Sequence, residues 1–131
     1  MPRRWPVLTD GDRAALQRVL DRGVLSGAAA PEIKALESEF AAFLGAAFCL
    51  ATNSGTAALH IALGAMGAGP GDEIIVPALS FVATAQAVLQ HGARPVFADI
   101  DPATGNMNAD DAAARITPRT RAIVPVHLHG Q

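Results

Sequence analysis

The sequence predicts an α/β fold in which flanking helices cover both faces of a mostly parallel sheet. Three observations predict this class. From residue 48 onward, four short apolar runs alternate with three helical segments. The runs are apolar on both of their faces, which is typical of buried parallel strands. The composition is 50% hydrophobic and 17% charged, which is enough apolar material for a sizeable core.

Two helices are expected before the first strand. Thr9 and Asp12 form a capping pattern ahead of apolar residues at helical spacing, which predicts a helix over residues 11–22 that ends at Gly23. Pro31 opens a second helix, and Gly45 ends it. The apolar stripe of this second helix consists of Ile33, Leu36, Phe40, Phe43 and Leu44.

The remaining elements alternate along the chain. The expected strands are FCLAT, EIIVP, RPVFADI and RAIVPVH, and the expected helices span residues 55–66, 81–91 and 109–115. Pro77 and Pro125 fall at strand ends, where a missing backbone N–H is tolerated. Cys49 is expected to be a small core residue of the first strand. The glycine-rich run 64–72 follows a helix and precedes a strand, the reverse of a dinucleotide fingerprint, so we interpret it as a helix stop and turn.

The length of 131 residues allows one domain at most. Residues 1–45 would hold the N-terminal helices and a loop, and residues 46–131 the β/α units. The chain ends at HLHGQ, just after a strand, and an open sheet of four strands is short. We therefore expect residues 1–131 to be a piece of a larger domain with an incomplete sheet.

Charge and composition restrict the classes of molecule that could bind this protein. Ten basic and twelve acidic residues give a formal net charge of −2, which argues against a nucleic-acid or anionic-membrane partner and favours a small molecule or a protein. No apolar stretch reaches the roughly 20 residues of a membrane span. One cysteine cannot form an internal disulfide, and the first residues lack a secretory pattern, so a cytoplasmic location is expected.

Two segments could bind a ligand. Ser54, Gly55 and Thr56 stand between an expected strand and an apolar helix, where free backbone N–H groups at the first helical turn would bind an anion such as phosphate. The alternative is an ordinary helix capped by Ser54 or Asn53. Phe81 follows the next strand, at the edge where open α/β sheets bind ligands, and it could stack on a flat heteroaromatic ring. The alternative is a core phenylalanine.

Other polar residues are interpreted as structural. His127 and His129 would share a face of an extended chain, but without a placed carboxylate they predict the rim of a cleft rather than a metal site. Asp99 and Asp101 could contact a ribose, and we favour a turn that includes Gly105. No metal site is predicted.

Four blocks in register add a resemblance to a known family: NSGTAAL, GAGPGDEIIVPALSFVATAQAV, GARPVFADIDPATGNMN and ITPRTRAIVPVHLHGQ. They closely resemble the first half of the catalytic domain of the DegT/DnrJ/EryC1/StrS aminotransferases, which are pyridoxal-phosphate enzymes of aspartate-aminotransferase-like fold. The resemblance runs from about Trp5 to Gln131. It implies that Ser54, Gly55 and Thr56 hold the cofactor phosphate and that Phe81 stacks on the pyridine ring. It also implies that Ser26 and Gly27 lie on the substrate side of the site.

The same resemblance implies a function for a longer protein. An amino donor would charge the cofactor, and a keto sugar, often linked to a nucleotide, or a related carbonyl compound would accept the amine in a homodimer. In this family a lysine holds the cofactor and an aspartate pairs with its ring nitrogen, and both lie beyond residue 131. Lys34 is the only lysine, and we expect it to be solvated and paired with Glu32 and Glu37. The 131 residues alone are therefore predicted to be inactive, with no catalytic residue among them.

Three alternatives remain open at this stage. A dehydratase branch of the same family carries histidine in place of the lysine. A non-catalytic fragment could bind a ligand in a regulatory or vestigial role. A plain Rossmann-like nucleotide binder is the third, and the order of elements around the glycine-rich run argues against it.

Overall fold

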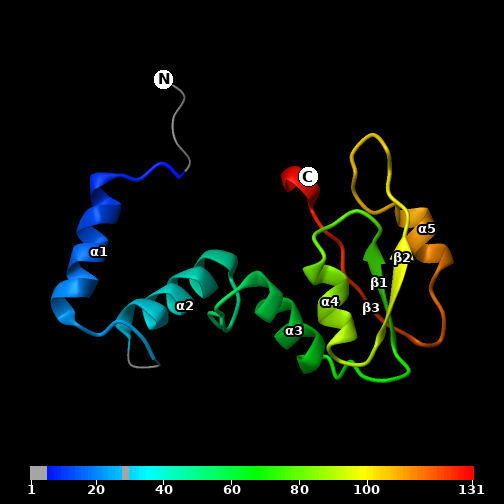
Figure 1. Ribbon diagram of the computed structural model, residues 1–131, viewed down its shortest axis with the longest axis horizontal. Coiled ribbons are helices and arrows are strands. Elements are labelled where there is room, and N and C mark those ends of the chain that lie inside the picture. The colour runs from blue at the N-terminus through cyan, green and yellow to red at the C-terminus, as the bar shows by residue number, and fades with distance from the viewer. Residues whose placement is uncertain (1–5, 28–29) are drawn as a thin grey trace. The chain divides into compact units, whose positions relative to one another are not determined.

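The computed structural model describes residues 6–27 and 30–131, and Figure 1 shows their helices and strands. The chain divides into two compact units, with the boundary between residues 51 and 52. The first unit holds the helices α1 (Asp10–Arg22) and α2 (Pro31–Leu44). The second unit holds α3 (Gly55–Ala65), β1 (Glu73–Pro77), α4 (Ala83–Leu89), β2 (Arg94–Ala98), α5 (Ala109–Ala114), β3 (Thr120–Ile123) and a short 3-10 turn, Leu128–Gly130.

Local signals set the ends of both helices in the first unit. The Thr9 hydroxyl accepts a hydrogen bond from the Asp12 backbone N–H, and the Asp12 carboxylate accepts one from the Thr9 N–H at 2.7 Å, which is the predicted capping box. Gly23 ends α1 with a φ of 72°, a left-handed conformation that glycine adopts without strain. Pro31 stands at the first turn of α2, and Gly45 ends that helix. Both predicted helices are confirmed, and α1 begins one residue earlier than expected.

The predicted strand over residues 48–52 is wrong. Among the described residues this segment joins no sheet, and instead the Ala51 N–H donates to the Glu37 carboxylate at 2.9 Å. A strand forms only when a neighbour takes its backbone hydrogen bonds, and apolar composition alone does not supply that neighbour. Phe48 is 92% exposed, and Cys49 lies half-buried in a loop rather than in a core strand.

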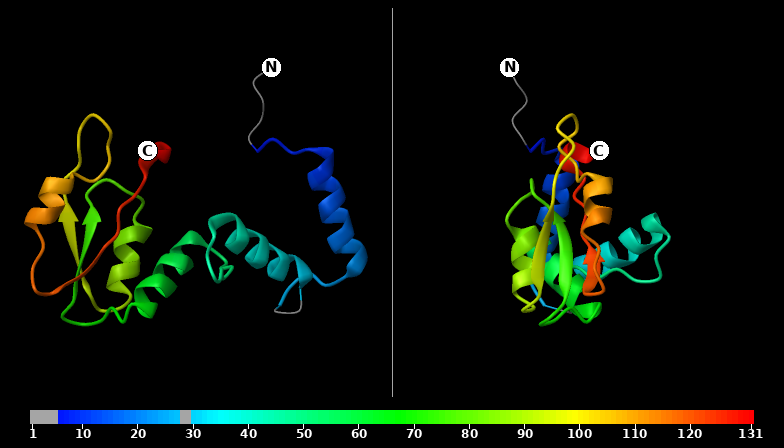
Figure 2. Two further views of the ribbon diagram at one scale, coloured as in Figure 1. Left: turned by 180° about the vertical axis from the view of Figure 1, so that it is seen from behind. Right: turned by 90° about the vertical axis from the view of Figure 1, so that its right-hand side faces the viewer.

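The predicted parallel sheet is confirmed with three strands instead of four. Its order is β2-β1-β3, and β1 pairs in parallel with both neighbours. All five residues of β1 are buried, as the run of apolar residues predicted. On one face, Ile74 and Val76 pack with Val88 of α4 and Leu63 of α3. On the other face, Ile75 packs with Ala98 and with Ala112 of α5. Figure 2 shows the sheet between α4 and α5.

Several predicted boundaries in the second unit need correction. Helix α4 is Ala83–Leu89 rather than 81–91, because its N-terminus has no side-chain cap and its C-terminus turns at Gly92, where φ is 70°. Strand β3 ends at Ile123, so Pro125 lies two residues beyond it, whereas Pro77 is the last residue of β1 as predicted. The run 64–72 is a helix stop and turn, as expected, with left-handed glycines at Gly67 and Gly71.

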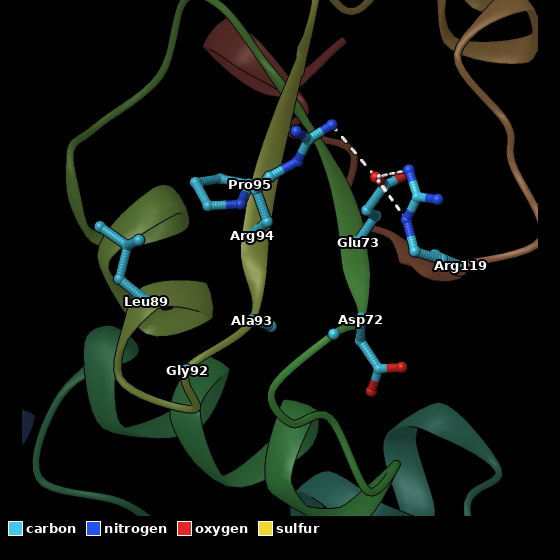
Figure 3. A pocket seen from close by; sticks show the side chains of 9 residues that line it. Asp72, Glu73, Leu89, Gly92, Ala93, Arg94, Pro95 and Arg119 are labelled. Atoms are coloured by element: carbon cyan, nitrogen blue, oxygen red, sulfur yellow. Dashed lines mark hydrogen bonds and ion pairs between the residues drawn. The ribbon is translucent and has the colours of Figure 1, made fainter.

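A buried carboxylate ties the amino ends of the three strands together (Figure 3). Glu73 of β1 is 2% exposed. Its Oε1 accepts hydrogen bonds from Arg119 at 3.0 and 2.7 Å and lies 3.1 Å from Nη2 of Arg94, while Oε2 accepts one from the Thr117 hydroxyl at 2.7 Å. The Thr117 hydroxyl, and then Arg119, hold the pKa of Glu73 below its ordinary value of 4.5. This cluster therefore fixes the strands at the edge opposite to the candidate site described below.

None of the helices in the described part of the chain is both long and apolar enough to cross a membrane.

Candidate functional site

The first turn of α3 presents unused backbone donors. The Ser54 hydroxyl caps the helix by accepting the Ala57 N–H at 3.1 Å, as predicted, and the Ser54 carbonyl accepts the Ala58 N–H at 3.0 Å. Among the described residues, no protein group accepts a hydrogen bond from the N–H of Gly55 or of Thr56. The two N–H groups and the Thr56 hydroxyl are therefore available to an external acceptor.

The charge distribution at this turn favours an anion as the acceptor. Three other helices carry an acidic residue in their first turn, namely Asp10 and Asp12 in α1, Glu32 in α2, and Asp110 and Asp111 in α5. Helix α3 has none, so no side chain of its first turn neutralises the positive end of its dipole. A phosphate there would accept hydrogen bonds worth about 1.5–3 kcal/mol each. The helix dipole would add up to about 2 kcal/mol.

A largely apolar hollow of about 860 Å³ lies beside this turn. Segments that follow the carboxyl ends of two strands close it: residues 80–84 after β1 and residues 126–128 after β3. Its lining is Gly55, Thr56, Ala58, Leu59, Ala62, Ser80, Phe81, Ala83, Thr84, Val126 and Leu128. Open α/β sheets bind their ligands at this edge. The structure therefore brings Gly55, Thr56 and Phe81 together, with Ser54 as the cap directly before them.

Phe81 is suited to contact a ligand rather than to fill a core. It was predicted as the first residue of a helix over 81–91, but it lies in the link between β1 and α4, and it is 76% exposed. An exposed aromatic side chain that lines an apolar hollow can stack on a flat ring at a small cost in side-chain entropy. The alternative of a core phenylalanine is wrong.

Two hydroxyl residues of this site were missed in the sequence. Ser80 and Thr84 stand on either side of Phe81, and their hydroxyl oxygens lie 2.9 Å apart. Thr84 is buried, and its N–H donates to the Phe81 carbonyl at 3.1 Å. These bonds fix the turn that carries Phe81. The available signal was a pair of hydroxyls four residues apart around an aromatic residue, but α4 was expected to begin at residue 81.

The segment after β3 lines the hollow with different residues from those the sequence singled out. Val126 and Leu128 line it, whereas His127 and His129 alternate with them and do not. His127 Nδ1 lies 2.8 Å from the Gln131 carbonyl oxygen, and His129 has a φ of 57°. The two histidines therefore do not share one face of an extended strand. Among the described residues, no group of three or more His, Cys, Asp or Glu side chains could hold a metal ion.

The other sequence candidates are not among the residues that line this hollow. Ser26 and Gly27 are exposed residues of the loop after α1, in the first compact unit, and their substrate-side role stays a prediction. Asp101 forms the expected turn, since its carbonyl accepts the Gly105 N–H at 2.7 Å. Lys34 is exposed, as predicted, but its expected pairing is wrong, because Glu32 pairs with Arg22 and Glu37 binds a backbone N–H.

A helix N-terminus with free N–H groups, beside an apolar hollow with an exposed aromatic residue, could accept a phosphorylated flat ring. Pyridoxal phosphate has this chemistry, and the donor set fits its phosphate while Phe81 fits its ring. Residues 6–131 match the DegT/DnrJ/EryC1/StrS aminotransferase family. The chain therefore belongs to this family, and its sheet and helices are an N-terminal part of the fold of pyridoxal-phosphate aminotransferases.

Individual relatives agree with this assignment. The chain is 49% identical over 119 residues to the UDP-2-acetamido-2-deoxy-3-oxo-D-glucuronate aminotransferase of Pseudomonas aeruginosa, covering 90% of this chain and 32% of that protein. It is 45% identical over 126 residues to the 3-amino-5-hydroxybenzoate synthase of Amycolatopsis mediterranei, covering 96% and 32%. The structure of Spr1654 from Streptococcus pneumoniae in its PLP form is similar with a TM-score of 0.84 and 34% identity, covering 99% and 33%. The chain thus spans about a third of the length of these relatives.

Proposed function

We propose that these residues supply the phosphate-binding and ring-stacking part of a pyridoxal-phosphate site that transfers an amine to a keto sugar, nucleotide-linked in particular, or to a related carbonyl compound. The observation that carries the proposal is the α3 turn, whose free N–H groups and first turn without acidic residues stand beside Phe81 and its hollow. The relatives support the acceptor class, since one is by name a UDP-keto-sugar aminotransferase.

The residues of this chain have three roles in the proposal. Gly55 and Thr56 would hold the phosphate through their backbone N–H groups and the Thr56 hydroxyl, in a turn kept rigid by the Ser54 cap. Phe81 would lie against one face of the ring and keep water from it. Bound there, pyridoxal phosphate supplies the carbonyl carbon and the electron-withdrawing ring that amino transfer requires. Ser26 and Gly27 would contact the substrate.

We also propose that residues 1–131 alone do not transfer an amine. Lys34 is the only lysine, and it is an exposed residue near the start of α2, without the desolvation that activates an amine. A homodimer is proposed for the longer protein. Its support is the apolar surface that the first compact unit exposes on its helices, including Leu16 at 63%, Leu20 at 61% and Phe43 at 82%.

An amino-transfer assay tests the function. The longest chain that the gene encodes is supplied with pyridoxal phosphate, an amino acid and a panel of nucleotide-linked keto sugars, and mass spectrometry follows the conversion of keto sugar to amino sugar. The expected result is an amino sugar formed together with the keto acid of the donor, and none from residues 1–131 assayed in parallel. Absence of amine transfer to every carbonyl acceptor, or loss of water from the sugar instead, would overturn the proposal.

A further inference from the structure

The loop between β2 and α5 reaches the proposed cofactor hollow through Leu128. Leu128 lines the hollow, and its backbone N–H donates to the Asn106 side-chain oxygen at 2.9 Å, across 22 positions in the sequence, and to the nearby Val126 carbonyl at 3.1 Å. Backbone N–H groups in irregular segments need such a partner when they are shielded from water. Asn106 therefore fixes the main chain of a residue in the wall of the hollow.

The side chain of Leu128 is held by the same loop. Gly105 has a φ of 74°, and a Cβ built on it would lie 2.8 Å from Cδ2 of Leu128 and 3.7 Å from Cδ2 of Leu79. Real carbon atoms do not approach this closely without displacement. The missing side chain at Gly105 thus lets the loop backbone lie directly against Leu128.

The loop itself is rigid enough to act as a support. The Asp101 N–H donates to the Asn106 carbonyl at 2.9 Å, and the Gly105 N–H donates back to the Asp101 carbonyl at 2.7 Å. Met107 forms an antiparallel bridge with Ile100 and packs on the core under α5. Moving Leu128 toward the loop would therefore require breaking hydrogen bonds in the loop, and moving it away would break its bond to Asn106.

We propose that Asn106 and Gly105 are positioning residues that hold Leu128 in the wall of the hollow and thereby set its affinity for pyridoxal phosphate. They act from two points, one on the backbone of Leu128 and one on its side chain. This proposal rests on the proposed function for its ligand. The placement of Leu128 by Asn106 and Gly105 can be measured without that ligand.

Matched variants of the longest chain that the gene encodes separate positioning from stability. Gly105→Ala and Gly71→Ala both place a side chain at positive φ, 74° and 94°, but a Cβ at Gly71 meets nothing within 4 Å. Both should lower the unfolding temperature because of backbone strain. Only Gly105→Ala should also raise the Kd for pyridoxal phosphate, by about fivefold, which corresponds to about 1 kcal/mol.

Two substitutions by residues of similar size test the role of Asn106. Asn106→Leu removes the side-chain acceptor and leaves the Leu128 N–H only the Val126 carbonyl at 3.1 Å, so it should raise the Kd by a similar factor and speed hydrogen exchange of the Leu128 amide. Asn106→Asp keeps an acceptor oxygen and should restore both values. Equal Kd values for Gly105→Ala and Gly71→Ala, or an unchanged Kd in Asn106→Leu, would overturn the proposal.

A wild-type chain that binds no pyridoxal phosphate would contradict the proposed function. In that case, hydrogen exchange of the Leu128 amide still tests whether Asn106 holds Leu128 in place. If exchange is faster in Asn106→Leu than in Asn106→Asp, the placement of Leu128 stands. Equal exchange in the two variants would overturn it.

Discussion

Replacing Phe81 with leucine isolates the stacking contact from the stability of the fold. Because the ring is 76% exposed, the substitution should change the free energy of unfolding by no more than about 0.5 kcal/mol. Leucine keeps an apolar side chain but loses the aromatic face, whose stacking is worth about 0.5–1.5 kcal/mol beyond buried area. At about 1.4 kcal/mol per factor of ten, the Kd for pyridoxal phosphate should rise about 2- to 12-fold.

The assay is an equilibrium titration with pyridoxal phosphate, followed by its absorbance, on the longest chain that the gene encodes. Phe97→Leu is the matched control, since Phe97 is 51% exposed on β2 and does not line the hollow. Its Kd should equal that of the native protein. The stacking role is refuted if Phe81→Leu binds as tightly as the control, or if its unfolding temperature without cofactor falls far below that of the control.

Three further predictions concern the frame around the site. The pKa of Glu73 is lowered from its ordinary value of 4.5. The ion cluster around Glu73 therefore stabilises the fold at pH values above 4.5, and this stabilisation is lost as the pH falls below 4.5. Glu73→Gln should therefore lower the unfolding temperature at neutral pH. It should also reduce the fall of the unfolding temperature between about pH 5 and 3. Unchanged acid sensitivity would contradict this. Gly64→Ala should give no gain in stability, because the new Cβ would lie 3.0 Å from Cε1 of His91. In a His91→Ala background, the same substitution should stabilise the protein by about 1 kcal/mol, because alanine has a higher helix propensity than glycine. Equal effects in both backgrounds, measured by denaturant unfolding, would show that the contact is harmless. Asn108→Ala should lower the free energy of unfolding by about 1 kcal/mol, because it removes the cap of α5. Asn108→Asp, the control, keeps a capping oxygen and should retain most of the native stability.

The elements that depend on neighbouring residues in the chain could be predicted from the sequence. The capping box at Thr9, the glycine at Gly23 and the cap at Ser54 each depend on bonds within a few residues, and all three are present. The parallel sheet followed from strands that are apolar on both faces. Its central strand is indeed buried along its whole length.

The errors arose where a neighbour distant in sequence decides the structure. Residues 48–52 have the composition of a strand, but the described residues offer them no strand partner, and a carboxylate takes the Ala51 N–H instead. The ion pairs of Glu73 could not be predicted, because its partners Arg94 and Arg119 come from other parts of the chain.

The candidate site divides in the same way. The turn at residues 54–56 and Phe81 could be predicted, because each directly follows an apolar run at the edge where ligands bind. The support of Phe81 by Thr84 and of Leu128 by Asn106 could not be predicted, since hydrogen bonds across a turn or across 22 positions leave no periodic signal in the sequence.

The central claim is that the first turn of α3 holds the phosphate of the cofactor while Phe81 stacks on its ring. A crystal structure of the longest encoded chain with pyridoxal phosphate tests this most directly. The account predicts phosphate oxygens about 2.7–3.2 Å from the backbone nitrogens of Gly55 and Thr56, with the ring against Phe81. A phosphate bound at another place, or a ring out of contact with Phe81, would contradict it.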